Sequence, residues 1–303
     1  MWEERYEVKM HRAGKGERGI ALLLVLWLIV LLSVIGGSHA RNGRMELNLA
    51  ANQREALQAR LHAEAGLYMA IDDLLVSSRE GGFRLRGVEN QVEFEGTQLT
   101  VSIINATGLI DINQATPSTL EALIVSTGMK EEQARSLVDA ILDWRDADDL
   151  IRLQGAEARQ YATAGLAYRP ANARFKSVQE LKMVLGMTAE TYRAIVPFIT
   201  VHSKGGALDS AQAPAALLRQ LEQQEAAVMR GSAGRQIDRP QVPGSLPRQL
   251  PAYPIYHLDV RAVTGQGGRS HIRAVVDISG NLQRRYRILA WRELAGDQEV
   301  KDG

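Results

Sequence analysis

The longest apolar run in the chain extends from Ile20 to Gly37 and contains no charged residue. Its 18 residues would rise roughly 27 Å as an α-helix, which is close to the thickness of the hydrocarbon core of a bilayer. Five basic residues precede the run and two follow it closely: Arg5, Lys9, Arg12, Lys15 and Arg18, then Arg41 and Arg44. This bias predicts one transmembrane helix, with the N-terminus in the cytoplasm and the bulk of the chain outside.

Three interpretations of this apolar run compete. A secretory signal peptide would be cleaved after Ala40, where Ser38 and Ala40 supply the small residues that signal peptidase requires, although its apolar core is usually only about 7–15 residues long. A plain signal anchor would keep the segment in the mature protein. In the third interpretation Gly19, between a basic head and an uninterrupted apolar helix, marks the cleavage site of prepilin peptidase.

A second helical pattern follows the apolar run. From Arg44 to Ser78 no proline interrupts the chain, and apolar residues recur at spacings of 4, 7, 3 and 4: Leu57, Leu61, Tyr68, Ile71 and Leu75. Such spacing predicts an amphipathic helix with a single apolar stripe. We expect a sheet or other helices to cover that stripe, and Gly81-Gly82 to end the helix.

Strand patterns occur in two separate parts of the sequence. Residues 92–104, "VEFEGTQLTVSII", alternate around Glu95-Gly96-Thr97 and predict a β-hairpin. From Tyr256 onward three further alternating segments, separated by glycine-containing turns, predict an antiparallel meander. We expect both groups of strands to belong to one sheet.

Residues 109–201 have a helical pattern with an internal near-repeat. Each half has a capping residue, a short helix, a Gly-Met turn and a second helix; the caps are Thr116 and Ser177, and the turns begin at Gly128 and Gly186. This plan predicts two helix-turn-helix units. Residues 203–252 are rich in Gly, Ala, Gln and Pro and read as a connection with a short helix near residues 214–229.

The charge balance limits the classes of partner. The formal net charge is +1, from 36 basic and 35 acidic residues, so no global field attracts nucleic acid. Helix-hairpin-helix modules bind phosphate through a Gly-x-Gly turn, but neither Gly-Met turn here has a second glycine and both are followed by acidic residues. A membrane-anchored DNA receptor, as in DNA-uptake systems, is therefore the alternative rather than the preferred function.

No enzyme signature is present in the sequence. The six histidines have no pair at metal-ligand spacing, and the chain lacks a Gly-x-Ser-x-Gly motif, a phosphate loop and any cysteine. These observations predict a protein that is not an enzyme and has no disulfide or thiolate zinc site. A secreted hydrolase, released by cleavage after Ala40, is a second alternative.

Acidic residues crowd a short segment in the predicted helical block. They are Asp139, Asp143, Asp146, Asp148 and Asp149, with Glu157 after Gly155. Like charges at helical spacing repel each other, and the alternation Asp146-Ala147-Asp148 is typical of loop-type calcium sites, although the segment lacks the glycine and the glutamate of an EF-hand. The pattern predicts a structural calcium site; an acidic surface and a catalytic carboxylate pair are the alternatives.

Taken together, these segments resemble a known family. The leader ending at Gly19, the long helix, the interrupted sheet, and the segments "GLIDINQAT", "DWRDADD…GAEARQY" and "FKSVQELKMVLGMT…YRAIVPFITV" are similar to the minor pseudopilin K family of type II secretion systems. The likeness covers roughly residues 15–303. The chain departs from the family in its long, partly acidic leader and in Leu150-Ile151-Arg152, which replaces a more polar stretch after the aspartates.

The resemblance implies an α+β fold. In it a pilin-like N-terminal transmembrane and spine helix packs on an antiparallel sheet, and a large all-α domain of helix-turn-helix (SAM-like) repeats is inserted. The implied parts are a prepilin leader (1–19), a transmembrane segment (20–37), the periplasmic half of the spine helix (38–80), the first part of the sheet (81–108), the inserted helical domain (109–202), a connection (203–252) and the C-terminal strands (253–303).

The resemblance also implies processing and partners. Prepilin peptidase would cleave between Gly19 and Ile20, and the new amine of Ile20 would be methylated. The mature chain would be a single-pass inner-membrane protein with a periplasmic bulk, placed at the tip of the pseudopilus over minor pseudopilins I and J and in contact with the inner-membrane assembly platform. It would help to export folded proteins and bind no nucleic acid. Calcium would be bound in the insertion by Asp146, Asp148 and Glu157, which fall at matching acidic positions, with Asp143 and Asp149 as further candidate ligands.

The fifth residue after Gly19 is Leu24, where most pilin-type subunits carry a glutamate that pairs with the amine of a neighbouring subunit. A carboxylate in the bilayer costs about 2.5–3.5 kcal/mol on insertion scales, so it is tolerated where a neighbour supplies the partner. The absence of the acid suits the first subunit of a filament, which has no neighbour beyond it.

We therefore expect Leu24→Glu to be processed normally, with a mature N-terminus at Ile20 by N-terminal sequencing, and yet to disturb filament initiation or the position of the subunit. Secretion assays and partner co-purification measure this effect. Wild-type secretion together with unchanged partner binding would contradict the role assigned to Leu24.

Overall fold

The computed structural model describes residues 17–76, 82–203, 208–231, 254–279 and 285–294, with the side chains of 17–20, 36–44 and 224–231 left undescribed. Most of the predicted leader and residues 232–253 of the predicted connection lie outside the described residues. The chain divides into two compact units, residues 1–55 and 56–303. Helix α1 (Glu17–Leu75) contributes residues to both units.

In the first unit, the side chains from Ala21 to Ile35 are exposed, and Ser33 is the one polar residue among them. The Ser33 hydroxyl donates to the carbonyl of Ile29 at 2.7 Å, which satisfies it within the helix. The predicted transmembrane segment 20–37 extends beyond these described side chains at both ends. Over the part of the chain that the structure describes, no helix is both long enough and apolar enough to cross a membrane.

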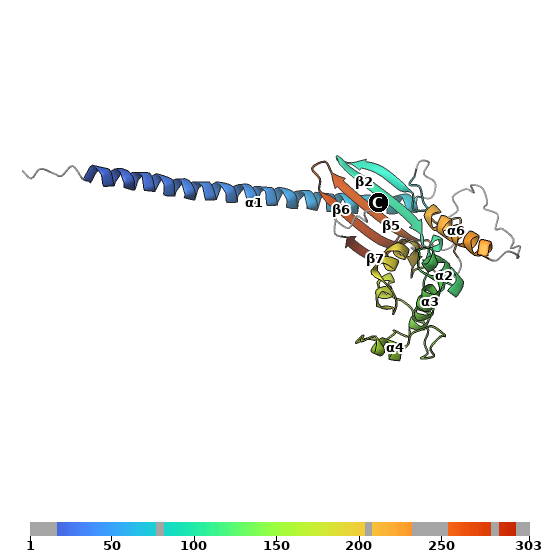
Figure 1. The fold of residues 1–303 in the computed structure, drawn as a ribbon. Helices are drawn as coiled ribbons and strands as arrows, with labels where there is room; N and C mark the ends of the chain where they lie inside the picture. The colour runs from blue at the N-terminus through green and yellow to red at the C-terminus, as the bar shows by residue number, and fades with distance from the viewer. Residues whose placement is uncertain (1–16, 77–81, 204–207, 232–253, 280–284, 295–303) are drawn as a thin grey trace, which may run out of the picture. The chain divides into compact units, whose positions relative to one another are not determined.

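The second unit contains a five-stranded antiparallel sheet with the strand order β1-β2-β5-β6-β7 (Figure 1). Its strands are β1 (Glu89–Phe94), β2 (Thr97–Asn105), β5 (Ile255–Thr264), β6 (Arg269–Asp277) and β7 (Arg287–Leu294). Phe94 pairs with Thr97 across the predicted hairpin turn. Val101 pairs with Val260, which joins the two groups of strands in one sheet as predicted. A mixed fold of helices and antiparallel sheet is thereby confirmed.

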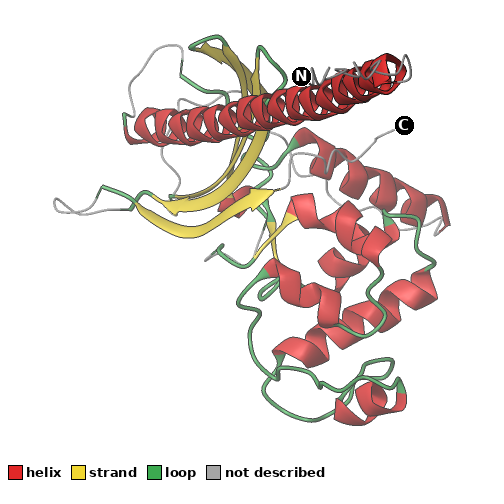
Figure 2. Cartoon of the chain, turned by 90° about the vertical axis from the view of Figure 1, so that its left-hand side faces the viewer, coloured by secondary structure: helices red, strands yellow, loops and turns green. Residues whose placement is uncertain are grey.

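The second-unit part of α1 lies across one face of this sheet (Figure 2). The buried apolar residues of this part of the helix are Ala59, Ala63, Leu67, Ala70, Ile71 and Leu74. Leu67 and Leu74 share a core cluster with Leu99, Val101 and Val260 of the sheet. The hydrophobic effect over this face is the main term that holds the helix on the sheet.

The predicted single stripe of α1 was wrong in part. Leu57, Leu61 and Tyr68 are 55%, 52% and 48% exposed, whereas Ile71 is buried. The helix carries two apolar faces, and half of the buried apolar residues on the sheet face are alanines, which a pattern of large apolar residues does not reveal. Small residues let the helix backbone approach the strands closely. At Gly66, an added Cβ would lie 3.1 Å from Val260 Cγ1 and 3.2 Å from Leu99 Cδ1.

A helical segment lies between β2 and β5 in the sequence. Its described elements are η1 (Ala106–Gly108), β3 (Ile110–Asp111), α2 (Pro117–Val125), α3 (Glu131–Arg145), α4 (Ala158–Thr163), η2 (Val178–Met183), α5 (Ala189–Ile195), η3 (Val196–Phe198), β4 (Ile199–Thr200) and α6 (Ala215–Gly231). They surround a core that includes Ile124, Leu137 and Tyr161.

The predicted helix starts and turns of this segment are present. The Thr116 hydroxyl accepts the backbone N–H of Thr119 at 3.2 Å, and Gly128 and Gly186 both have φ of +89°, which favours glycine. The short helix predicted after Ser177 is the 3₁₀-helix η2.

Two features of the segment were not predicted. β3 and β4 form a parallel pair, in which Ile110 aligns with Ile199. In addition, Ala213 and Leu217, both fully buried, belong to the helical core, although they lie in the predicted connection. The Gly-, Ala- and Gln-rich composition of 203–252 conceals the apolar face of α6.

A histidine connects the helical segment to the sheet. His257 on β5 lies 2.9 Å (Nε2 to Oγ1) from Thr200 on β4, and its ring centroid is 6.2 Å from that of His202. Burial, together with the positive charges of His202 and Arg273, lowers the pKa of His257 to about 3. The folded state therefore keeps this imidazole neutral at pH values where the unfolded chain would protonate it.

Acid is expected to destabilise the second unit through His257. The unfolded pKa is about 6.5, so the free energy of unfolding is fully retained above that pH and falls as the pH drops below it, by about 1.4 kcal/mol at pH 5.5. Denaturant unfolding at pH 7.5 and 5.5 measures the difference. In His257→Gln, which keeps a hydrogen-bonding side chain without a titrating group, the loss should shrink by about that amount. An equal loss in both proteins would contradict this assignment.

Candidate functional site

The C-terminal end of α3 positions the predicted acidic residues, which lie in its last turn and in the loop that follows. The Arg145 guanidinium donates to the carbonyls of Ile112 and Ala115, and the indole of Trp144 stacks on Phe175, with the two ring centroids 6.0 Å apart. These contacts fix the last turn of the helix. At Asp146 the backbone becomes extended (φ −79°, ψ 169°), and the loop that connects α3 to α4 begins.

Asp143, in the last turn of α3, is fully buried and holds this loop. Its Oδ2 accepts the backbone N–H of Arg152 at 3.3 Å, while its Oδ1 has no hydrogen-bond partner among the described residues. The Arg152 Nε lies 3.3 Å from that Oδ1 without hydrogen-bond geometry. A Cβ added at Gly155 would overlap Asp143 Oδ2. Burial raises the pKa of Asp143, and the charge of Asp146 raises it further.

The remaining aspartates line the loop in different environments. The Asp148 Oδ1 accepts the N–H of Leu150 at 2.9 Å, and Asp149 Oδ1 accepts Nδ2 of Asn172 at 2.7 Å. Both are exposed. Asp146 Oδ1 is buried and has no hydrogen-bond partner in the described part of the chain, and the same is true of Asn172 Oδ1.

Glu157 immediately precedes α4 and is buried, with 7% of its surface exposed. Neither carboxylate oxygen has a hydrogen-bond partner among the residues that the structure describes. Burial, followed by the charges of Asp143 and Asp146, raises the pKa of Glu157 to about 7. A buried carboxylate that faces other carboxylates is costly unless a cation compensates it.

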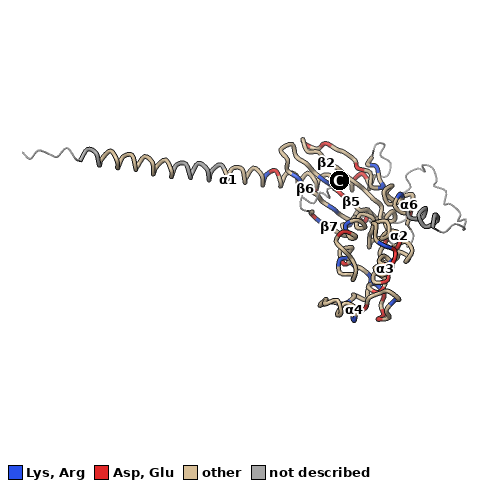
Figure 3. The backbone as a smooth tube through the Cα atoms, in the orientation of Figure 1, with Lys and Arg blue, Asp and Glu red and all other residues tan. Residues whose placement is uncertain are grey.

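The structure thus brings the predicted acidic residues together in the last turn of α3 and the loop to α4. Figure 3 shows acidic residues on α3 and along this part of the chain. Within the described residues, no three His, Asp or Glu side chains are arranged as a ready metal site. The buried oxygens without partners nevertheless fit a hard cation, because calcium binds carboxylate and amide oxygens. The assignment of the predicted ligands stays a prediction.

Asn172 was missed by sequence reasoning. It lies 23 residues beyond Asp149 in the chain, and its amide donates to the Asp149 carboxylate and, at 3.0 Å, to the backbone carbonyl of Asp148. Its φ of +45° is in the left-handed region, where asparagine is enriched. An asparagine in a loop carries no sequence signal that links it to acidic residues so far away.

A second candidate surface is the apolar face of α1 that points away from the sheet core. We define the α1 outer row as Leu57, Leu61 and Tyr68, which are spaced four and seven residues apart and are about half exposed. Nothing among the described residues buries these three side chains. Exposed apolar rows at helical spacing are typical of helix–helix interfaces.

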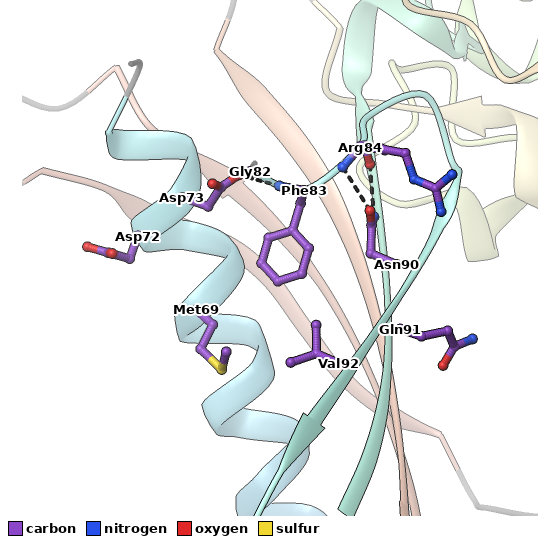
Figure 4. Close-up of a pocket in the computed structure, with 9 residues that line it drawn as sticks. All are labelled: Met69, Asp72, Asp73, Gly82, Phe83, Arg84, Asn90, Gln91 and Val92. Atoms are coloured by element: carbon purple, nitrogen blue, oxygen red, sulfur yellow. Dashed lines mark hydrogen bonds between the residues drawn. The ribbon is translucent and has the colours of Figure 1, made fainter. Parts of the chain in front are cut away.

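A groove lies between α1 and the edge strand β1 (Figure 4). Its volume is about 580 Å³, and Met69, Phe83 and Val92 supply its apolar lining. Asn90 fixes one wall, since its side chain accepts the N–H of Arg84 at 2.8 Å and donates back to the Arg84 carbonyl at 2.9 Å.

The predicted processing residues lie in the first unit. Gly19 and Ile20 are within α1, but their side chains lie outside the described ones. Leu24 is on the same helix and is 66% exposed. Cleavage between Gly19 and Ile20 stays a prediction.

Comparison with known proteins gives a consistent result. Residues 99–204 match the family model described as Type II secretion system (T2SS), protein K. The Type II secretion system protein K of Pseudomonas aeruginosa is 30% identical over 208 residues, covering 61% of this chain and 62% of that protein. The protein of the same name from Dickeya chrysanthemi is 23% identical over 240 residues, covering 62% and 67%. The chain thus spans roughly two thirds or less of the length of these relatives.

Among solved structures, the chain is similar to one chain of the crystal structure of the GspK-GspI-GspJ complex from the enterotoxigenic Escherichia coli Type 2 Secretion System. The TM-score is 0.54 at 15% sequence identity, and the match covers 81% of this chain and 99% of that one. At this identity the likeness concerns the fold. The stretch matched by the family model contains the whole acidic loop.

The close contact between Gly155 and the Asp143 carboxylate can be tested by substitution. Gly155→Ala should lower the free energy of unfolding by about 1–3 kcal/mol, because the new methyl group overlaps the fully buried Asp143 carboxylate and lies close to Arg152 Cβ. Gly265→Ala is the matched control, since its Cβ would meet only the Gly96 carbonyl oxygen at 3.8 Å, and it should change stability by less than about 0.5 kcal/mol. Equal denaturation midpoints for the two variants would contradict the tight packing.

Proposed function

Because this chain belongs to the protein K family of type II secretion systems, we propose that it is a non-enzymatic minor pseudopilin. In this role it sits at the tip of the pseudopilus, helps to initiate assembly, and supports the export of folded proteins across the outer membrane. Its direct partners are minor pseudopilins I and J, in line with the GspK-GspI-GspJ complex whose structure shares this fold. Prepilin peptidase and the inner-membrane assembly platform complete the set of partners.

The observation that carries the proposal is the α1 outer row. A helix that covers a sheet needs one apolar face, and α1 has a second one: Leu57, Leu61 and Tyr68 remain about half exposed after the helix has packed on the sheet. Exposed apolar side chains at this spacing favour burial against a helix of another subunit. In a pseudopilin α1 packs against neighbouring subunits, and that contact would bury this exposed face. In an isolated protein the face would stay exposed to solvent.

The first unit supports a membrane anchor. The described side chains from Ala21 to Ile35 are exposed and, apart from Ser33, apolar. In the proposed mature protein, cleavage after Gly19 leaves Ile20 as a methylated N-terminus, and the segment 20–37 holds the chain in the inner membrane with its bulk in the periplasm.

Calcium is the proposed ligand of the acidic loop. Asp143, Asp146 and Glu157 would hold the ion with their buried oxygens that lack partners, and Asn172 is a further candidate. Asp148 and Asp149 stand at the exposed rim of the loop. When bound, the divalent cation supplies positive charge that compensates the mutual repulsion of the carboxylates, and thereby fixes the loop between α3 and α4.

The alternative of a DNA receptor finds little support in the helical segment. The start of α3 carries Glu131 and Glu132, and the nearby cation Arg135 is paired with Glu121 at 2.8 Å and Glu131 at 3.2 Å. The turn's own cation, Lys130, is followed directly by these two glutamates, so the local charge gives little attraction to phosphate.

The outer row is tested by charge insertion. Leu57→Lys and Tyr68→Lys in the full chain should weaken co-purification with minor pseudopilins I and J at least about tenfold, because an unpaired ammonium would be buried in an apolar interface. Folding should be preserved, since both side chains lie off the sheet core.

The control is Val263→Lys, on β5. Val263 is 43% exposed and alternates along the strand with Ala262 and Thr264, which are buried, so it lies on the opposite face of the sheet from the α1 core. This variant should bind both partners as the wild type does. If the α1 variants retain full binding, or if Val263→Lys loses as much, the proposed interface is wrong.

Calcium is tested by stability. The melting temperature of the detergent-solubilised full chain should rise by several degrees with calcium and fall with a chelator, since binding to the folded state alone adds RT ln(1 + [L]/Kd). Asp143→Asn should abolish most of the calcium-dependent shift. Identical melting with calcium and with chelator would remove calcium from the proposal without touching the pseudopilin assignment.

A further inference from the structure

We propose that Arg152 is a built-in counterion that competes with the metal cation for the acidic loop. This inference rests on the calcium site of the proposed function and adds a regulatory residue to it. Arg152 would hold the carboxylates together while the loop is metal-free, and would move out into solvent when the cation binds.

The guanidinium of Arg152 lies against two of the proposed ligands. Its Nε is 3.3 Å from Asp143 Oδ1, and its Nη2 is 3.4 Å from Asp146 Oδ2. Asp143 has no exposed surface, whereas 45% of the Arg152 side chain is exposed. A single cation from the loop itself therefore bridges the carboxylate at the end of α3 and the first carboxylate of the loop.

This compensation is incomplete. Charge-assisted N–H···O contacts are usually about 2.7–2.9 Å long, and both distances here are longer. Asp143 Oδ1 and Asp146 Oδ1 still lack hydrogen-bond partners in the part of the chain that is described, as do both oxygens of Glu157. One guanidinium thus balances part of the negative charge and leaves the most buried glutamate uncompensated.

A divalent cation and the guanidinium exclude each other. Calcium takes six to eight oxygens at about 2.3–2.6 Å, so an ion bound to Asp143 Oδ1 would stand within repulsive distance of a guanidinium that is 3.3 Å from the same atom. Arg152 is free to leave, because its side chain is half exposed and its neighbours Ile151 and Leu153 are 49% and 96% exposed.

The backbone of Arg152 contacts Asp143 independently of the side chain. Its N–H donates to Asp143 Oδ2 at 3.3 Å, and this contact does not depend on the side chain. A substitution at position 152 therefore removes the competing charge while it keeps the attachment of the loop to α3. Arg152→Gln is the informative variant, and Arg152→Lys, which keeps the charge, is the conservative one.

The proposal predicts that Arg152→Gln changes the stability of the metal-free state but not that of the metal-bound state. Without metal, Arg152→Gln should be less stable than the wild type, because Asp143 and Asp146 lose their only ion-pair partner among the described residues. With metal bound, the two proteins should be equally stable, because the guanidinium has already moved away. The calcium affinity of Arg152→Gln should then be higher, by about fivefold for a partly exposed ion pair.

The experiment uses the full chain in detergent. Calorimetric titration with calcium chloride gives the dissociation constant, and thermal melting with a chelator and with saturating calcium gives the stability of each state. Arg159→Gln is the matched control. Arg159 is also exposed and close in sequence, two residues after Glu157, but it forms no ion pair within the described residues, so it reports the effect of lost charge without lost contact.

We expect Arg152→Gln to bind calcium about fivefold more tightly, with a lower melting temperature in chelator and an unchanged one in calcium. Arg152→Lys and Arg159→Gln should stay within about twofold of the wild type. Unchanged or weaker binding by Arg152→Gln overturns the proposal, and so does equal tightening by Arg159→Gln, which would show a long-range charge effect. If the wild type itself binds no calcium, the metal site of the proposed function fails first, and the competition fails with it.

Discussion

The pairing of β2 with β5 is the constraint on which the rest of the second unit depends. Nine residue pairs, from Thr97 with Thr264 to Asn105 with Tyr256, connect strands that are about 150 residues apart in the sequence. Because the pairing brings residues 105 and 256 side by side, everything between them must leave the sheet and return at the same end. Long-range pairing of this kind costs loop-closure entropy that grows only slowly with loop length, so a segment of this size is tolerated between two neighbouring strands.

The helical segment is then connected to the sheet by few but specific contacts. Thr200, from the short strand β4, meets His257 of β5, and Arg86, which precedes β1, donates through Nε to the carbonyl of Ala213 at 3.1 Å. The first of these contacts involves an imidazole that the fold keeps neutral. The position of the acidic loop relative to the sheet thus depends on side chains that lie outside the loop itself.

Helix α1 has two apolar faces, one that packs on the sheet and one that stays partly exposed. The alanine-rich face with Gly66 lets the helix approach Leu99 and Val260 closely, so that dispersion and apolar burial stabilise the contact. The outer row keeps large side chains half exposed. The acidic loop shows the reverse situation, because there charged carboxylates with unpaired oxygens are buried instead of apolar side chains being exposed. The exposed apolar row and the buried unpaired carboxylates would each destabilise an isolated domain. A partner subunit would bury the first, and a bound cation would compensate the second.

The sequence by itself determined the elements and the chemistry that is local in the chain. The hairpin at Glu95-Gly96, the helix start at Thr116, the glycine turns and the crowding of aspartates all follow from residues within a few positions of each other. Only the tertiary structure decided which face of α1 meets the sheet, because alanines at Ala63 and Ala70 are as compatible with solvent as with a core until the strands are placed. It also decided that Asn172 joins the acidic loop, that the Arg152 guanidinium lies against Asp143 and Asp146, and that Leu217 belongs to the helical core. These are contacts across the fold, whose energies depend on distances that no local pattern encodes.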